Sequence, residues 1–143
     1  MGNFFAPTAG RFGVLPNLVT GRCAANIANS TTTTYNFGGH PATCLVSRAM
    51  VSAGTVPTSA SAVTGVLQKY DATANAAVAL TAAVDLLTLT AHEGTAVSLL
   101  SSLTDAQKTL RPGDTLRFVI TAAGTITAQA VDLMVNTEVL VQN

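Results

Sequence analysis

Charged side chains are scarce in this chain of 143 residues, and tryptophan is absent. Charged residues make up 10% of the sequence, against about 25% in an average globular protein. Because the seven basic and seven acidic residues cancel, no excess positive charge is present to bind nucleic acid or anionic lipid. A surface so poor in charge favours association over dispersal. We therefore expect a protein that works docked to other protein, with neither nucleic acid nor a membrane as its partner.

Residues that usually carry catalysis or bind metals are also few. His40 lies in a Gly-Gly-His-Pro turn, and His92 begins a His-Glu pair that lacks the second histidine of a zinc-protease motif. The two histidines and the two cysteines, Cys23 and Cys44, lack the spacing of a zinc site. Neither a nucleophile elbow nor a phosphate-binding loop is recognisable. We expect no catalytic, cofactor-binding or metal-binding residues, and we predict that the chain is not an enzyme.

Two cysteines are fewer than secreted disulfide scaffolds carry. We favour two unpaired, partly buried thiols, with a Cys23–Cys44 bridge as the alternative. The first residues, Met1–Pro7, lack the basic start and apolar run of a signal peptide. The longest apolar-rich run, Ala76–Ala91, is too short and too polar to span a bilayer. We expect a soluble protein that is made in a reducing cytoplasm.

The residues that are abundant favour β-structure. Ala, Val, Thr and Ser dominate, and the β-branched members of this set suit pleated sheet. The clearest strand is Leu116–Thr121, in which Leu116, Phe118 and Ile120 share one face while Arg117, Val119 and Thr121 share the other. A Pro-Gly-Asp turn precedes this strand and positions it.

Seven or eight strands are expected along the chain, in an all-β antiparallel sandwich of the jelly-roll type. In the second strand, Leu45, Ala49 and Val51 are predicted to lie opposite Cys44, Val46, Arg48 and Met50. The final strands are predicted to pair with each other across Ala122–Thr125. A helical turn or polar loop is expected at Leu103–Lys108. The predicted strands are Thr31–Phe37, Ala42–Val51, Val63–Tyr70, one or two short strands within Val78–Thr90, Gly94–Ser102, Leu116–Thr121 and Ile126–Val141.

Residues 1–30 differ from the rest and read as an extended N-terminal arm with little regular structure, followed by a β-sandwich domain over residues 31–143. The arm holds Phe4, Phe5 and Phe12 together with Pro and Gly, and no period persists along it. Burying these aromatic rings on a partner would offset the entropy lost when the arm becomes ordered. The alternative is that the arm folds back across its own sheet.

Three segments of the sequence resemble the head decoration, or capsid cement, proteins of tailed bacteriophages. They are Thr81-Ala-Ala-Val-Asp-Leu, then Gly94-Thr95 with its Val/Leu strand, and Leu110-Arg-Pro-Gly-Asp followed by the apolar strand to Thr125. The resemblance covers roughly Val63–Val141 and leaves out the arm. It implies a jelly-roll body that self-associates, commonly as trimers, on the outer surface of the virion. There it would bind the major capsid protein and stabilise the capsid lattice.

Within this interpretation, Phe4, Phe5 and Phe12 are candidate anchors on the capsid, and Arg11 or Arg22 pairs with capsid carboxylates. Two other functions stay open. One is a carbohydrate-binding or receptor-binding module of a phage fibre, although sugar platforms usually expose Trp or Tyr and this chain has only Tyr35 and Tyr70. The other is a different structural subunit of a head or tail.

Overall fold

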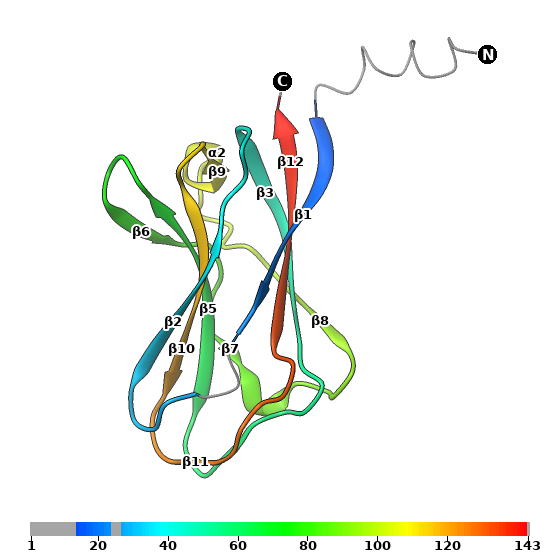
Figure 1. Ribbon diagram of the computed structural model, residues 1–143, viewed down its shortest axis with the longest axis vertical. Helices are drawn as coiled ribbons and strands as arrows, with labels where there is room; N and C mark the ends of the chain where they lie inside the picture. The colour runs from blue at the N-terminus through cyan, green and yellow to red at the C-terminus, as the bar shows by residue number, and fades with distance from the viewer. Residues whose placement is uncertain (1–13, 24–26, 143) are drawn as a thin grey trace, which may run out of the picture.

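The computed structural model describes residues 14–23 and 27–142, and it shows two antiparallel sheets packed face to face (Figure 1). The predicted all-β antiparallel sandwich is therefore confirmed. Sheet A has the order β1 (Val14–Arg22), β12 (Met134–Gln142), β3 (Cys44–Ser52) and β8 (Gly94–Val97), with β9 (Thr109–Leu110) also beside β3. Sheet B has the order β2 (Thr32–Gly38), β10 (Thr115–Ala122), β5 (Val63–Asp71) and β6 (Ala76–Ala79), with β7 (Val84–Asp85) also beside β5.

Smaller elements lie in the connections. Strands β4 (Thr58–Ser59) and β11 (Ile126–Ala128) form a separate two-stranded sheet, and η2 (Leu86–Thr88) is a single 3₁₀ turn. The expected helical turn is α2 (Asp105–Lys108), which begins with a capping box between Thr104 and Gln107. Of the helices in the part of the chain described, none has the length and apolar character that a membrane crossing requires.

The strands pair in a nested order. Strand β1 pairs with β12, β2 with β10, β3 with β8 and β5 with β6, and every one of these pairs is antiparallel. Strand β12 also pairs with β3, and β10 with β5, which completes the two sheets. Because Val14 lies opposite Gln142, both described ends of the chain leave the sandwich at the same end (Figure 1).

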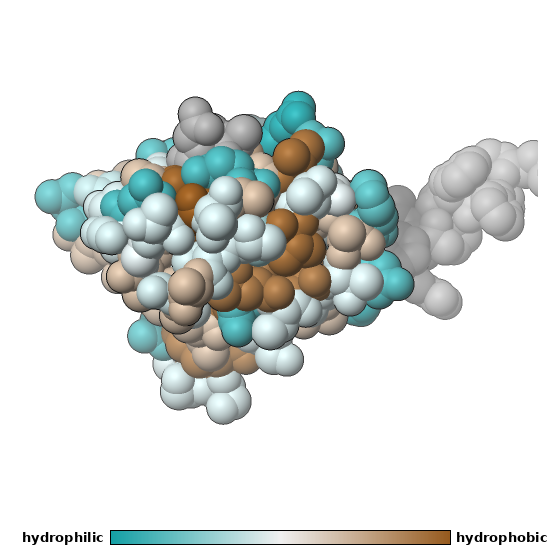
Figure 2. All heavy atoms as spheres, turned by 90° about the horizontal axis from the view of Figure 1, so that it is seen from below, coloured by the Kyte–Doolittle hydropathy of each residue, from teal (hydrophilic) through white to brown (hydrophobic). Residues whose placement is uncertain are grey.

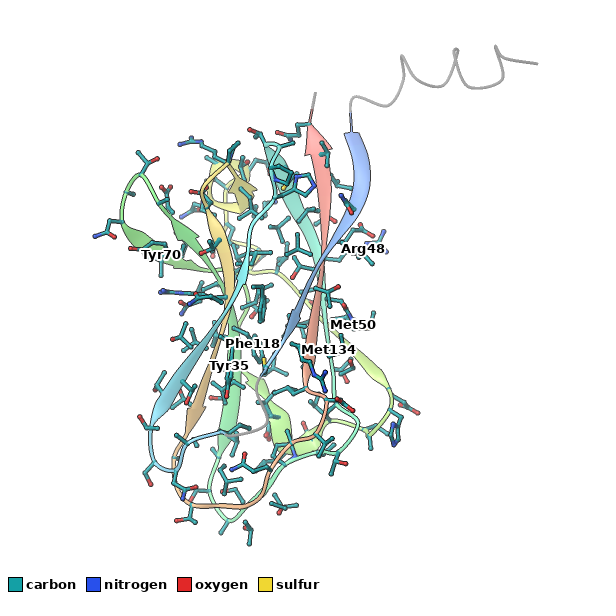
Figure 3. All side chains as sticks on the ribbon, in the orientation of Figure 1. Tyr35, Arg48, Met50, Tyr70, Phe118 and Met134 are labelled. Atoms are coloured by element: carbon teal, nitrogen blue, oxygen red, sulfur yellow. The ribbon has the colours of Figure 1, made fainter. Side chains whose placement is uncertain are left out.

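The strand that was clearest in the sequence is at the centre of the core. Leu116, Phe118 and Ile120 of β10 are completely buried, whereas Arg117 and Val119 lie half-buried on the outer face. Phe118 lies between the sheets (Figure 3), and its ring packs onto Gly65 of β5 so closely that a Cβ there would lie 2.2 Å from Cζ. Glycine at position 65 is therefore required by the approach of the ring.

The Pro-Gly-Asp turn is held by a buried carboxylate. Asp114 is 3% exposed, and its Oδ2 accepts the backbone N–H of Arg111 at 2.9 Å. Its Oδ1 accepts the N–H of Ala72 at 3.0 Å, which ties the turn to the loop after β5. Gly113 has φ 101°, a value that favours glycine. The turn residues predicted from the sequence thus have a structural role in joining two loops.

The predicted faces of the second strand are wrong, because β3 contains a β-bulge. Its pairing with β12 shifts between Arg48 and Val46, so that Ser47 is an additional residue on β3. Alternation restarts after the bulge. The inward, buried residues are consequently Cys44, Val46, Ala49 and Val51, and the outward ones are Leu45, Ser47, Arg48, Met50 and Ser52.

The predicted pairing of the final strands across Ala122–Thr125 is also wrong. Strand β10 belongs to sheet B and β12 to sheet A, while the intervening β11 pairs with β4. The backbone of this turn bonds to other loops. Ala123 donates its N–H to the carbonyl of Ala62 at 2.9 Å, and the carbonyl of Gly124 accepts from Ser30 at 3.0 Å. The turn therefore carries the chain from one sheet to the other.

The irregular arm predicted for residues 1–30 is wrong for Val14–Arg22, which form β1. Two residues that are uncommon within strands, Pro16 and Gly21, made this strand difficult to recognise in the sequence. Pro16 is acceptable because β1 is an edge strand, with a partner on one side only. Gly21 is needed because the ring of Phe37 lies where its Cβ would be, at 2.0 Å. Residues 1–13 lie outside the described part of the chain.

The two cysteines are both free and buried, as the favoured interpretation predicted. Cys23 bonds to Leu133 at one end of sheet A, and Cys44 lies opposite Val141 at the other. Eight residues of strand separate these two positions, which corresponds to about 26 Å. A disulfide needs Cα atoms within about 7 Å, so these thiols cannot be joined without rebuilding the sheet.

Candidate docking surface

A groove of about 560 Å³ crosses the outer face of sheet A, the face directed away from sheet B. Side chains of β1, β12 and β3 line it, together with the segment that begins in β8. Leu18 and Met50 supply exposed apolar surface, and Asn136 and Glu138 supply polar groups. Val97 and Leu99 also line the groove, but they are partly buried and pack against the core. Figure 3 shows Arg48 and Met50 projecting from sheet A on the side opposite Phe118. The groove is thus an apolar hollow with a polar border on an open sheet face.

Two apolar side chains in this groove are unusually exposed. Leu18 is 63% exposed and Met50 is 41% exposed, and Val131 is the other large hydrophobic residue so exposed among those described. A single exposed apolar residue is normal on a protein surface. Two that line the same hollow form a patch of the kind that marks contact sites.

Local backbone features place the residues of the groove. The bulge in β3 turns Arg48 outward, where its Nε lies 3.5 Å from Oε1 of Glu138 on β12. Ser47 also donates to that oxygen, at 2.8 Å, and so holds the carboxylate in place. The missing side chain of Gly94 leaves space for Met50, whose Sδ lies 2.0 Å from the position a Cβ would take. Met50 consequently lies flat over β8.

Arg22 is the one predicted contact residue that the structure describes. It ends β1 on the same outer face as Leu18, and its guanidinium forms an ion pair with Asp132. Both side chains are more than half exposed, so the pair adds little stability and leaves Arg22 at the surface. The other predicted contact residues, Phe4, Phe5, Arg11 and Phe12, lie outside the described residues.

The outer face of sheet B carries a cluster of polar side chains that interact with one another. The guanidinium carbon of Arg117 lies 5.0 Å from the centroid of the Tyr70 ring, and Arg117 Nε donates to Gln68 at 3.0 Å. The hydroxyl of Tyr70 donates to Asn75. Because Arg117 covers one face of the ring, that face of Tyr70 is not open for stacking by a sugar.

A buried lysine has a structural role. Lys69 is 4% exposed, and its Nζ donates to the carbonyls of Thr109 at 2.8 Å and Ala106 at 3.4 Å. Asp71 lies 3.9 Å from the same nitrogen. The N–H groups of Ala74 and Thr73, with the charge of Lys69, lower the pKa of Asp71. Lys69 therefore fastens α2 to β5. Among the residues described, no group of three His, Cys, Asp or Glu could hold a metal ion.

A second apolar area lies at the end of the sandwich near β4 and β11. Figure 2 views the molecule from this end and shows hydrophobic residues near the centre of the face, with more hydrophilic residues around them. Val131, which is 48% exposed and bridges to Thr55, belongs to this region. The groove on sheet A has two exposed apolar side chains and a defined hollow, so it is the stronger candidate.

In comparisons with known proteins, no family model, curated protein or solved structure matches this chain. Sequence reasoning missed the groove because Leu18 lies in the segment read as an arm. The predicted alternation put Met50 and Arg48 on the same face, which is correct. It did not include the bulge at Ser47, which directs both side chains outward while Cys44 and Val46 point inward. The signal that was present is the spacing of Leu18, Thr20 and Arg22, which share one face of β1.

Proposed function

We propose that this protein is a structural virion subunit that docks on the outer surface of a phage capsid and stabilises the lattice of the major capsid protein. The groove across β1, β12, β3 and β8 is the observation that carries the docking function. It offers an apolar contact with one ion pair at its edge, on a body of zero net charge. The choice of a capsid as the partner rests on the resemblance of Val63–Val141 to decoration proteins.

The order of the strands supports a jelly roll. The pairs β1–β12, β2–β10, β3–β8 and β5–β6 are those of one long hairpin whose two arms have been rolled into a pair of sheets. The jelly roll, an eight-stranded double sheet that is common in viral capsid and lectin domains, pairs its strands in this order, and the short strands β7 and β9 are additional to these eight. Fold alone does not imply function, so this agreement supports the proposal without carrying it.

The groove supplies a modest free energy of binding. Complete burial of a Leu or Met side chain contributes about 1.5–3 kcal/mol. Scaled by the exposed fractions of Leu18 and Met50, the two side chains together contribute about 1.5–3 kcal/mol on docking. Association costs more than this, about 4 kcal/mol or above, so the groove must be part of a wider contact. A weak contact repeated over a shell suits a protein that reinforces a lattice.

The test is binding to expanded capsids that lack their decoration protein. We expect the purified chain to bind such capsids and to raise the temperature at which they burst. The variant Leu18→Asp places a charge in the apolar groove and should weaken binding by about tenfold or more. Ala79→Asp, which adds the same charge at an exposed position on the outer face of sheet B, is the matched control.

If both variants bind as the wild type does, the groove is not the docking surface. If the wild type neither binds capsids nor changes their burst temperature, the proposed partner is wrong. Location of the protein by electron microscopy of the parent particle would separate a capsid subunit from a subunit of a tail or fibre. A glycan array would test the alternative sugar-binding function.

A further inference from the structure

The long edges of the two sheets differ in whether they can accept another strand. Strand β1 carries Pro16, and β6 and β8 have four residues each, all features that discourage pairing at an edge. Strand β2 has seven residues, Thr-Thr-Thr-Tyr-Asn-Phe-Gly, with neither proline nor charge. Among the strands described, β2 is therefore the long edge that lacks protection against addition of a further strand.

The hydrogen-bonding direction of β2 follows from its register with β10. Ala122 donates its N–H to the carbonyl of Thr31, which lies opposite it because Thr121 lies opposite Thr32. In an antiparallel pair, opposite residues exchange backbone hydrogen bonds only at every second position, counted here from Thr31. Thr33 and Tyr35 consequently direct their backbone groups to β10. Thr32, Thr34 and Asn36 direct theirs to the free side. Nothing in the described chain is hydrogen-bonded to the backbone groups of these three residues on that side.

We propose that two copies of the protein pair through β2, antiparallel and about a two-fold axis at Thr34. In this register Thr34 faces the partner's Thr34, and Thr32 faces the partner's Asn36. All three residues with free backbone groups are then opposite one another, which forms about six backbone hydrogen bonds. A two-fold axis at Thr32 or Asn36 would align fewer of them, so Thr34 is the preferred centre.

A second copy is the occupant that the residues favour. An antiparallel strand pair is self-complementary, and the absence of charge on β2 means that no like charges meet across the axis. The inward side chains at this edge, Tyr35 and Phe37, are only half-buried although they pack against the core. The pairing would join the two B sheets into one continuous sheet.

The contact is small, so we expect a weak dimer, with a dissociation constant on the order of 0.1 mM. If the protein binds a capsid as proposed above, the dimer would bind it through two sites. This bivalency argument is the only part of the inference that rests on the proposed function. A dimer carries two grooves, and linked weak contacts bind a lattice more tightly than separate ones. The pairing itself is a property of the free protein and is tested without capsids.

The experiment uses two variants at the proposed axis, Thr34→Lys and Thr34→Glu. Thr34 is exposed, so neither change disturbs the core. Each variant alone brings two like charges face to face and should be monomeric, whereas an equal mixture brings opposite charges together. We expect the mixture to associate about tenfold more strongly than either variant alone, measured by sedimentation velocity up to about 1 mM. Thr20→Lys and Thr20→Glu, exposed changes on the edge strand β1, are matched controls and should leave association unchanged.

Hydrogen exchange supplies a second readout. As wild-type concentration rises, the amides of Thr32, Thr34 and Asn36 should become protected, while those of Thr33 and Tyr35 are protected at every concentration. The proposal is overturned if wild type stays monomeric to about 1 mM with these three amides exchanging freely. It is overturned equally if the mixture of Thr34 variants associates no better than each alone, or if the Thr20 variants have the same effect. None of these results bears on Leu18→Asp and capsid binding, so the two proposals fail independently.

Discussion

Thr137 is a polar side chain buried without compensation, and replacing it should stabilise the protein. It lies on the inward face of β12, opposite Val19 of β1 and Ala49 of β3, and is completely buried. Its Oγ1 has no hydrogen-bond partner among the residues described. An unsatisfied buried hydroxyl costs about 1–3 kcal/mol. Thr137→Val exchanges this hydroxyl for a methyl group of nearly the same shape, in a position surrounded by apolar side chains.

We expect Thr137→Val to raise the free energy of unfolding by about 1–2 kcal/mol. For a chain of this length, that corresponds to a rise of about 3–8 °C in the midpoint of thermal unfolding. Urea unfolding followed by circular dichroism measures the first quantity, and calorimetry measures the second. Thr137→Ser is the matched variant, because it keeps the hydroxyl and removes the methyl group. It should lower stability by about 1 kcal/mol.

A loss of about 1 kcal/mol or more in Thr137→Val would refute this reasoning, because it would show that the hydroxyl is bonded in the folded protein. The exposed replacement Thr127→Val in β11 controls for the general effect of adding a valine to a strand and should change stability by less than about 0.5 kcal/mol.

Three further predictions concern the core and the turns. Gly65→Ala should destabilise by about 1–3 kcal/mol in urea unfolding, because its methyl group would meet the ring of Phe118; an unchanged midpoint would mean that the sheets separate freely. Asp114→Asn should cost about 1–3 kcal/mol, because an amide NH₂ would replace one of two oxygens that accept backbone N–H groups; Asn at wild-type stability would contradict this. Burial raises the pKa of Cys23 from 9.0 to about 12, so the folded state disfavours the thiolate. Stability from this group is complete below pH 9.0 and is lost as pH rises toward about 12, and Cys23→Ala should reduce that alkaline loss.

The sequence was most informative where alternation was uninterrupted. Leu116, Phe118 and Ile120 were correctly predicted to share one face, because the alternation of β10 is unbroken and its partner β5 alternates in the same way. The Pro-Gly-Asp turn was recognisable because each residue has its own conformational preference. The short strands expected within Val78–Thr90 are present as the end of β6 and as β7, and the 3₁₀ turn η2 follows them.

The failures have identifiable physical causes. The bulge at Ser47 is not indicated by the residue types around it. It reverses the alternation of inward and outward side chains for the residues that follow it in β3. Ala122–Thr125 has the composition of a hairpin turn, yet the partners of its backbone, Ala62 and Ser30, are distant in sequence. The groove was not predictable for the same reason, because it is assembled from strands separated by more than a hundred residues. Only the pairing of β12 with both β1 and β3 brings Leu18 and Met50 to one face.

The nested order of strands has a consequence for synthesis. Strand β12 lies between β1 and β3 in sheet A, yet it is translated after every other described strand. While the chain emerges from the ribosome, β1 has no neighbour to bond with, and β3 keeps an open side. Nascent chains with such unpaired apolar strands are prone to aggregation and are the usual clients of chaperones. Sheet A can therefore form only after β12 has been translated and has paired with β1 and β3. Truncation within β12 should leave a chain that collapses without reaching the native sheet.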